Sequence, residues 1–265
     1  MRLSWWGLVA SFVLVVGCSE PPRGETSCES IRVLAASSLS NAFADLERAF
    51  LAEHDCVAEV DVIFGASSSL AAQVVNGAPV DVFVSASRES MRPVLENGTV
   101  GDPVIVARNS AAVMVSVESS FVSSIGSVVD LLEKRNKGIV VGLCAASVPC
   151  GALADRVLAN ASLVTGDESV SRANIADTEA SSAEDLVTKI QIGELDAGIT
   201  YMSDCASARA GRVRCVDITA DVNSTTDVVA VATSNSGIAR DFVDFLVGDA
   251  ARRILVDTHR FAEAT

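Results

Sequence analysis

The sequence is short of positive charge. It has 20 Lys and Arg residues against 34 Asp and Glu residues, so its formal net charge is −14 over 265 residues. A surface this acidic repels nucleic acid and anionic membrane faces, and neither is expected as a partner. It also opposes the long-range attraction of an anionic ligand. Any bound anion must therefore be held by local hydrogen bonds.

Patterns for metal binding and catalysis are also scarce. The only histidines are His54 and His259, both expected at exposed helix ends, and there is no Cys-x-x-Cys pair to hold a metal. Gly-x-Ser-x-Gly is absent, and neither histidine falls on a predicted strand-end loop near a serine cluster. A serine hydrolase is thus a weak hypothesis. We predict no metal site, no cofactor and no enzyme activity.

The N-terminal apolar stretch, from Trp5 to Val16, is too short for a membrane-spanning helix, which needs about 20 residues. It follows Arg2 and leads into Val-Val-Gly-Cys, which ends at Cys18. This order resembles a bacterial lipobox and implies a signal peptide over 1–17, cleavage before Cys18 and a lipid on the Cys18 thiol. The alternative is an ordinary secretory signal that contains a cysteine. Residues 18–30 form a polar tether, so we expect an exported, lipid-anchored protein in the periplasm or at the cell surface.

The cysteine count fits an exported protein. Seven cysteines leave six when the lipobox cysteine is set aside, an even number that suits an oxidising compartment. Six cysteines allow 15 connectivities. Two pairs each bracket one short loop, and the other two cysteines each precede a predicted strand, so they would meet at one sheet edge if those strands are parallel neighbours. We predict three disulfides: Cys28–Cys56, Cys144–Cys150 and Cys205–Cys215.

Strand-like and helix-like segments alternate along most of the chain, which indicates parallel sheets with right-handed crossovers. Candidate crossings between two lobes lie near 104–109 and 216–222. They predict a discontinuous first lobe, 31–108 plus 220–265, and a second lobe, 109–219. The expected strands are 31–36, 57–64, 80–85, 111–117, 138–143, 197–201 and 227–232, and the expected helices are 39–54, 68–76, 89–96, 128–135, 152–159, 183–192, 238–247 and 250–256.

Two runs of small polar residues stand at predicted strand-to-helix junctions, Ala35-Ala36-Ser37-Ser38-Leu39-Ser40 and Gly65-Ala66-Ser67-Ser68-Ser69-Leu70. Such a junction presents unpaired backbone N–H groups and the positive end of a helix dipole, and serine adds a neutral donor. Neither run contains Lys or Arg. One serine of this kind would be most simply explained as a helix cap. Two matched runs favour a receptor for a small oxyanion.

These runs belong to three segments, VLAASSLSNAFADLERAF, FGASSSLAAQVVNGAPVDVFVSAS and KIQIGELDAGITYMSDC. Together they resemble the molybdate-binding proteins of bacterial ABC importers, the ModA family, from about Ile31 to Phe261. The resemblance implies an α/β, type II periplasmic-binding-protein fold. In that fold each of two lobes is a mostly parallel sheet flanked by helices, and the ligand cleft lies between them. It further implies a monomer that captures molybdate or tungstate and delivers it to a permease and its ATPase.

The resemblance also implies which groups contact the oxyanion. Two serine hydroxyls, two backbone N–H groups and one tyrosine hydroxyl would donate hydrogen bonds, and no cationic side chain would take part. Carried onto this sequence, the donors are the hydroxyls of Ser38, Ser67 (or Ser68 if the register slips) and Tyr201, and the N–H groups of Cys150 and Ala183.

Two departures from the family pattern bear on these assignments. Cys150 stands where the family usually has alanine, which leaves its N–H unchanged as a donor. The segment 177–182 does not follow the pattern, so the Ala183 assignment is open by one residue. Because Glu179, Glu184 and Asp185 would repel a dianion, we expect them to point to solvent.

Other functions remain open at this point. The same scaffold could bind a different small oxyanion, sulfate or phosphate. Carboxylate-binding relatives generally place an arginine in the cleft, and the matched motifs contain none. A purely structural lipoprotein would leave both serine junctions without a role.

Overall fold

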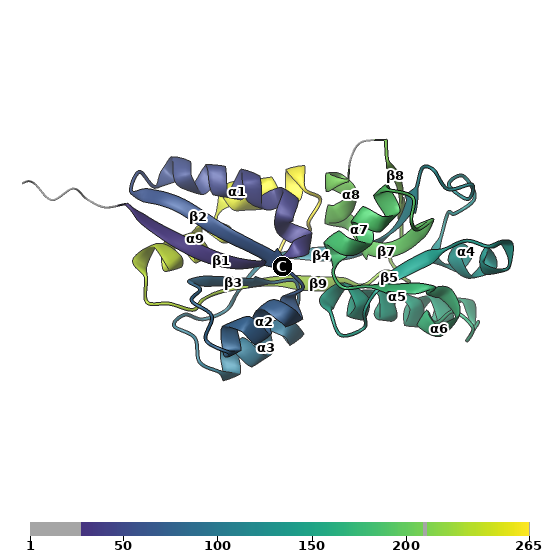
Figure 1. Cartoon of the computed structure of the whole chain (residues 1–265), viewed down its shortest axis with the longest axis horizontal. Coiled ribbons are helices and arrows are strands. Elements are labelled where there is room, and N and C mark those ends of the chain that lie inside the picture. Colours follow the sequence, from purple (N-terminus) through teal and green to yellow (C-terminus); the bar gives the residue numbers. More distant parts are fainter. Residues whose placement is uncertain (1–27, 209–210, 265) are drawn as a thin grey trace, which may run out of the picture.

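The computed structural model describes residues 28–208 and 211–264. The lipobox, including Cys18, lies outside these residues. Figure 1 shows two lobes side by side, each with a sheet between layers of helices, joined by two long strands. None of the described helices is both long and apolar enough to cross a membrane.

The first lobe is built on β1 (Glu29–Ala36), whose neighbours are β2 (Val57–Gly65) and β3 (Val82–Ser85), both parallel to it. Then β9 (Thr225–Ala232) pairs antiparallel with β3, and β4 (Val104–Ser116) pairs antiparallel with β9. The chain therefore returns from the second lobe to complete the first.

The second lobe is built on β5 (Val141–Cys144), with β6 (Thr178–Ala180) and β7 (Ala197–Tyr201) parallel to it. On the other side, β4 pairs antiparallel with both β7 and β8 (Val213–Asp217). The long strand β4 serves both sheets, because its residues up to Ser110 pair with β9 and those from Ala111 pair with β7.

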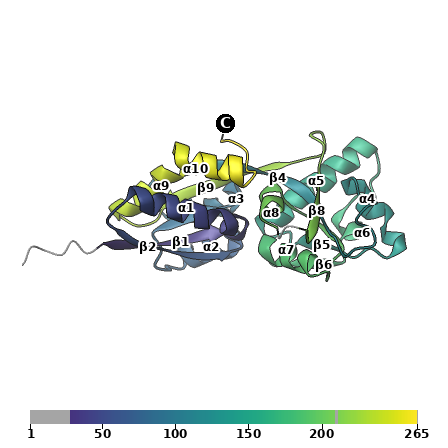
Figure 2. The same cartoon turned by 90° about the horizontal axis from the view of Figure 1, so that it is seen from above.

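Helices cover both faces of each sheet (Figures 1 and 2). A cluster of aromatic rings packs the first lobe: the ring of Phe50 lies 4.9 Å from that of Phe242 and 5.4 Å from that of Phe245. The first-lobe helices are α1 (Ser40–Glu53), α2 (Ser67–Val75), α3 (Arg88–Glu96), α9 (Gly237–Leu246) and α10 (Asp249–Arg253), with turns at Ser37–Leu39 and Ile254–Thr258. The second-lobe helices are α4 (Val128–Glu133), α5 (Pro149–Thr165), α6 (Arg172–Ile175), α7 (Ala183–Gln191) and α8 (Met202–Ser207), with a turn at Arg135–Lys137.

The predicted α/β class is confirmed, and the sheets are more mixed than predicted. Each sheet combines parallel pairs with antiparallel ones because β4 and β9, which run between the lobes, pair antiparallel with their neighbours. The prediction also missed β6, β8, α6 and α8, and α5 is longer than expected. These missed elements are three to six residues long, too short to show a hydrophobic period.

Two of the three predicted disulfides are present, Cys144–Cys150 and Cys205–Cys215. The third prediction was wrong for this structure: Cys28 and Cys56 are exposed free thiols. Their strands are parallel neighbours, as the prediction required. However, the two Sγ atoms lie 3.4 Å apart, whereas a disulfide needs about 2.05 Å.

The expectation of an exposed helix end was wrong for His259. Its side chain is buried, and its Nε2 atom lies 2.9 Å from Oδ2 of Asp45 on α1. The hydrogen bond from His259 is the main reason that the pKa of Asp45 is lowered. His259 therefore ties the C-terminal segment to α1.

Candidate functional site

A small cavity lies between the two lobes. Its volume is about 10 Å³, room for about one water molecule. Pockets for drug-sized ligands run from about 300 Å³ upward, so this cavity suits a compact ion. It is lined by Ala36, Ser37, Ser38, Gly65, Ala66, Ser67, Ala86, Val148, Pro149, Cys150, Ser182, Ala183 and Tyr201.

The first lobe contributes the two serine junctions. Because β1 and β2 are parallel with Ala36 opposite Gly65, both strands end at the same sheet edge. The chain then turns into the Ser37–Leu39 turn after β1 and into α2 after β2. The strand register therefore brings together two serine runs that are far apart in the sequence.

The hydroxyls of Ser38 and Ser67 are buried and do not cap helices. The N-cap positions are Ala36, Leu39 and Ala66, none of which makes a side-chain cap bond. The Ser38 hydroxyl has no hydrogen-bond partner. The Ser67 Oγ atom accepts a bond of 3.0 Å from the Ala86 N–H, which leaves its own proton for another acceptor.

The second lobe contributes Tyr201, at the end of β7. Its side chain is 1% exposed, and its hydroxyl is the other buried side-chain polar atom, besides that of Ser38, without a partner among the described residues. Burial, reinforced by the Asp204 carboxylate, raises the pKa of Tyr201 above its ordinary value. The phenol therefore stays protonated at physiological pH and can act as a hydrogen-bond donor.

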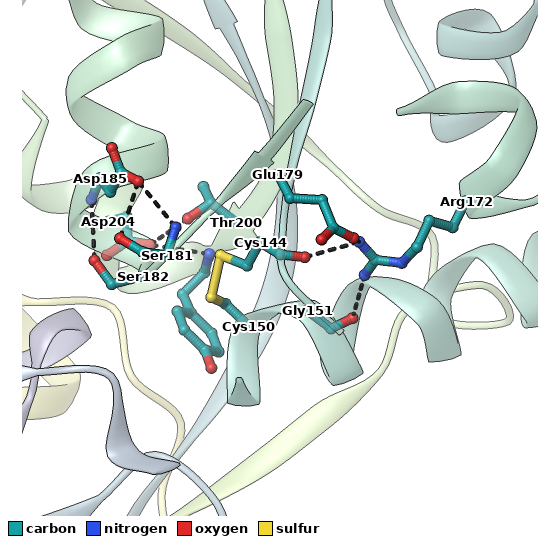
Figure 3. Close-up of a disulfide and its surroundings, with 11 residues drawn as sticks. Cys144, Cys150, Gly151, Arg172, Glu179, Ser181, Ser182, Asp185, Thr200 and Asp204 are labelled. Carbon is teal, nitrogen blue, oxygen red and sulfur yellow. Dashed lines mark hydrogen bonds and ion pairs between the residues drawn. A yellow bond between two sulfur atoms is a disulfide. The ribbon is translucent and has the colours of Figure 1, made fainter. Parts of the chain in front are cut away.

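The first turn of α5 brings Cys150 to the cavity wall, and three features fix this turn. The Cys144–Cys150 disulfide ties it to the end of β5. Arg172 donates hydrogen bonds to the carbonyl oxygens of Cys144 (2.8 Å) and Gly151 (3.1 Å), as Figure 3 shows. A Cβ atom at Gly151 would lie 1.9 Å from the carbonyl oxygen of Ala145, so only glycine fits there.

The first residue of α7 is Ala183, and it lines the cavity as predicted. Ser182 caps this helix by accepting a 3.1 Å bond from the Asp185 N–H. Since the first N–H groups of a helix have no intrahelical acceptor, the Ala183 N–H is free to bind a ligand.

No residue that lines the cavity carries a charged side chain. The acidic side chains near it are engaged or face outward: Glu179 pairs with Arg172, and Asp185 accepts from the Ser181 N–H. Glu184 is exposed, on a separate groove. None of the three carboxylates lines the cavity. Glu179 and Glu184 are exposed, as expected, whereas Asp185 is half-buried.

The structure thus brings Ser38, Ser67, Cys150, Ala183 and Tyr201 into one cavity, and Ser68 does not line it. Donors dominate its polar lining, and no cluster of three or more His, Cys, Asp or Glu side chains among the described residues could hold a metal ion. Sequence reasoning missed Ala86, which follows β3 and holds Ser67 in place. It also missed Ser37 and Ser182, although both neighbour predicted site residues.

Comparisons with known proteins agree with this geometry. A profile of the bacterial extracellular solute-binding protein family matches residues 31–259. The molybdate-binding protein ModA of Mycobacterium tuberculosis (strain H37Rv) is 33% identical over 269 residues, which cover 97% of each chain. ModA of Haemophilus influenzae is 28% identical over 233 residues, covering 85% of this chain and 87% of that one.

Solved structures share the fold. The periplasmic molybdate-binding protein of Azotobacter vinelandii aligns with a TM-score of 0.73 at 21% identity, over 89% of this chain and 100% of that one. The sulfate-binding protein SubI of Mycobacterium tuberculosis aligns with a TM-score of 0.74 at 17% identity, over 89% of this chain and 87% of that one. The two-lobed binding-protein architecture is therefore confirmed.

Replacing Gly151 by alanine should unfold the α5 turn or displace it. Because the added Cβ would overlap the Ala145 carbonyl oxygen, we expect a loss of at least about 2 kcal/mol in the free energy of unfolding. Urea denaturation measures it. The matched control is Gly237→Ala at the start of α9, where a Cβ meets nothing within 4 Å. Equal stability of the two variants would contradict the close approach at Gly151.

Replacing Asp204 by asparagine should stabilise the protein in a pH-dependent way. Burial raises the pKa of Asp204 to about 6 from 3.8, although bonds from the Thr200 hydroxyl and the Tyr201 N–H lower it. Between these values the folded state holds the proton more tightly than the unfolded state, so stability falls as pH rises. The advantage of Asp204→Asn over wild type should therefore grow from pH 4 to pH 7, by up to roughly 2–3 kcal/mol.

Denaturation at several pH values tests this dependence. Any pH-independent cost of the substitution is the same at every pH, so it does not affect how the stability difference between variant and wild type changes with pH. Asp167→Asn is the control, because hydrogen bonds from Ser169 lower the pKa of Asp167 and the sign of the effect is reversed. A pH-independent difference for Asp204→Asn would show that its carboxylate is not destabilised by burial.

Proposed function

The chain belongs to the bacterial extracellular solute-binding proteins, and we propose that it captures molybdate or tungstate and delivers it to an ABC importer. The family is one of binding proteins, so the chain is not an enzyme, and the family implies export. Relatives at 33% and 28% identity are named as molybdate-binding proteins.

The observation that carries the proposal is the pair of buried hydroxyls without partners. Ser38 and Tyr201 face one cavity from opposite lobes, and neither hydroxyl meets a protein acceptor. Leaving a buried polar group unpaired costs about 1–3 kcal/mol. Such groups persist where a ligand supplies the missing partner. An oxyanion does so by accepting from both hydroxyls.

In the proposed complex, five groups donate to the oxygens of one tetrahedral dianion. Their hydrogen bonds to a charged acceptor contribute about 1.5–3 kcal/mol each. Together they offset the loss of the ion's hydration inside a closed cavity. The donors are the hydroxyls of Ser38, Ser67 and Tyr201 and the N–H groups of Cys150 and Ala183.

The donor set also disfavours protonated anions. The N–H groups of Cys150 and Ala183 can only donate, and the Ser67 Oγ atom already accepts from Ala86, so an O–H on the ligand would lose a hydrogen bond at these positions. Phosphate carries at least one proton near neutral pH, whereas molybdate, tungstate and sulfate do not. Phosphate is therefore disfavoured as a ligand. Sulfate is unprotonated, so only the size of the cavity can distinguish it from the larger molybdate and tungstate ions.

Sulfate is the second candidate ligand. A sulfate-binding protein shares the fold with a TM-score of 0.74, and sulfate has the same charge and shape as molybdate. Its sequence identity to this chain is 17%, compared with 33% for a molybdate-binding relative. The proposal therefore ranks molybdate and tungstate first.

The remaining parts of the proposal concern how the protein works in the cell. The lipid on Cys18 would anchor it to the membrane through the tether at 18–30. The first lobe, 31–108 plus 220–265, and the second, 109–219, would close over the ion as a monomer and present it to the permease and its ATPase. No cofactor is needed.

Calorimetric titration of the mature chain should separate the candidate ligands. We expect saturable one-to-one binding of molybdate and tungstate, with sulfate and phosphate giving no heat at the same concentrations. Tight binding of sulfate with no response to molybdate would favour the second candidate. A folded chain that binds none of the four ions would contradict the proposal.

Replacing Ser38 and Ser67 by alanine together should abolish this binding while the apo protein stays folded. Neither side chain caps a helix, and the loss of the Ser67 acceptor for the Ala86 N–H should cost about 1–3 kcal/mol in the free energy of unfolding. Loss of two bonds to a charged acceptor predicts at least a 100-fold rise in the dissociation constant. The matched control is Ser68→Ala, one residue outside the cavity lining. Unchanged affinity in the double variant would exclude these hydroxyls from the site.

A further inference from the structure

A second hollow, the arginine groove, adjoins the cavity on the side of α3 and α5. It is lined by Arg88, Glu89, Arg108, Arg156, Thr225, Thr226 and Asp227 and has a volume of about 360 Å³. In Figure 1, α3 and α5 lie on the same side of the connecting strands β4 and β9. The groove therefore opens between the lobes.

Three arginines and two carboxylates line this groove, and one arginine is not paired with an acid. Arg88 and Arg108 both pair with Asp227. Arg156 is exposed and donates to neutral oxygens, with Nε 3.0 Å from the Ser224 Oγ atom and Nη2 3.3 Å from the Thr225 carbonyl oxygen. No carboxylate among the described residues lies within ion-pair distance of it. Its charge is consequently available to an anion in the groove.

The arginine groove and the cavity share a wall at Ala86. Thr226, in the groove, donates a 2.7 Å bond to the Ala86 carbonyl oxygen, and the Ala86 N–H donates to Ser67 in the cavity. On α5, Arg156 follows Cys150 by six residues, a rise of about 9 Å along the helix. An anion in the groove is thus one short step from the cavity.

The charge of Arg156 also acts on the pKa of Tyr201 in the cavity. Burial and the Asp204 carboxylate raise the pKa of Tyr201, and Arg156 acts in the opposite direction. Charges within about one Debye length, roughly 8 Å at physiological ionic strength, are only partly screened, so lower salt should strengthen this interaction.

The opposite side of the cleft has the opposite charge. A groove of about 290 Å³ between α1 and the helices α7 and α8 is lined by Glu184 and Asp204 together with uncharged residues. No cation lines it. An approaching dianion is repelled on this side and attracted on the other, although the chain as a whole carries −14.

We propose that the arginine groove is the entrance of the site, where Arg156 makes the first electrostatic contact with the tetrahedral dianion before it passes to the neutral donors. This inference rests on the proposed function. A local positive patch raises the association rate in a salt-dependent way and leaves the dissociation rate almost unchanged. Arg156 thus attracts the approaching dianion, and the neutral donors of the cavity hold it once it is bound.

The test is the association rate of molybdate measured by stopped flow. Tyr201 is the only tyrosine, and both tryptophans, Trp5 and Trp6, lie in the signal peptide, so tyrosine fluorescence of the mature chain reports the cavity directly. Arg156→Gln should lower the association rate about threefold to tenfold at low salt, with the difference shrinking at high salt. The dissociation rate should stay within twofold.

Two further variants separate charge from structure. Arg156→Lys keeps the charge and changes the hydrogen bonds to Ser224 and Thr225, so it should associate at nearly the wild-type rate. Arg212→Gln changes the net charge equally, and Arg212 pairs with Glu118 away from the arginine groove. Arg212→Gln should change the association rate only by the small amount that the altered net charge causes.

Four outcomes would overturn the inference. An unchanged association rate in Arg156→Gln, with wild type binding molybdate, refutes it and leaves the proposed function standing. The inference is also refuted if Arg212→Gln lowers the association rate as much as Arg156→Gln does. It is refuted likewise if Arg156→Lys lowers that rate equally. A wild-type chain that binds no oxyanion refutes the proposed function, and the inference falls with it.

Discussion

The site depends on polar groups that the protein buries without giving them acceptors. The hydroxyls of Ser38 and Tyr201 are unpaired, and each costs folding free energy that two hydrophobic groups in the same places would not. The surrounding structure must therefore hold these donors in place without satisfying them. This requirement explains why the donors stand at the ends of rigid strands and the starts of helices.

The rigid parts on either side of the cavity are built differently. In the first lobe, the parallel register of β1 and β2 aligns both serine junctions, and Ala86 fixes Ser67 through one backbone bond. In the second lobe, the turn at Cys150 has a disulfide, a glycine that no other residue can replace, and the guanidinium of Arg172 on two carbonyl oxygens. Arg172 also pairs with Asp155 and, as Figure 3 shows, with Glu179, so its positive charge is neutralised by carboxylates that do not line the cavity.

The sequence was informative where a residue's role follows from its neighbours along the chain. Both serine junctions follow predicted strands, and the two short-range disulfides bracket single loops, so these could be predicted. The role of Ala86 could not, because an alanine that donates one N–H has no side-chain signal. The free thiols of Cys28 and Cys56 show a different limit: strand order places two cysteines side by side, and side-chain geometry decides whether a bond forms.

The link between the cavity and the connecting strands also escapes sequence reasoning, since it joins three distant segments. Asn109, on β4 next to the point where this strand changes sheets, donates a 2.8 Å bond to the Ser203 hydroxyl. Ser203 in turn donates to the carbonyl oxygen of Ser38 in the other lobe, at 3.4 Å. All three residues are buried. Separating the lobes would break the bond to Ser38 and leave the one to Asn109, so contacts beside the site help to hold the lobes in the arrangement that this structure shows. Because the bond to Ser38 is long, it favours this arrangement without preventing ligand release.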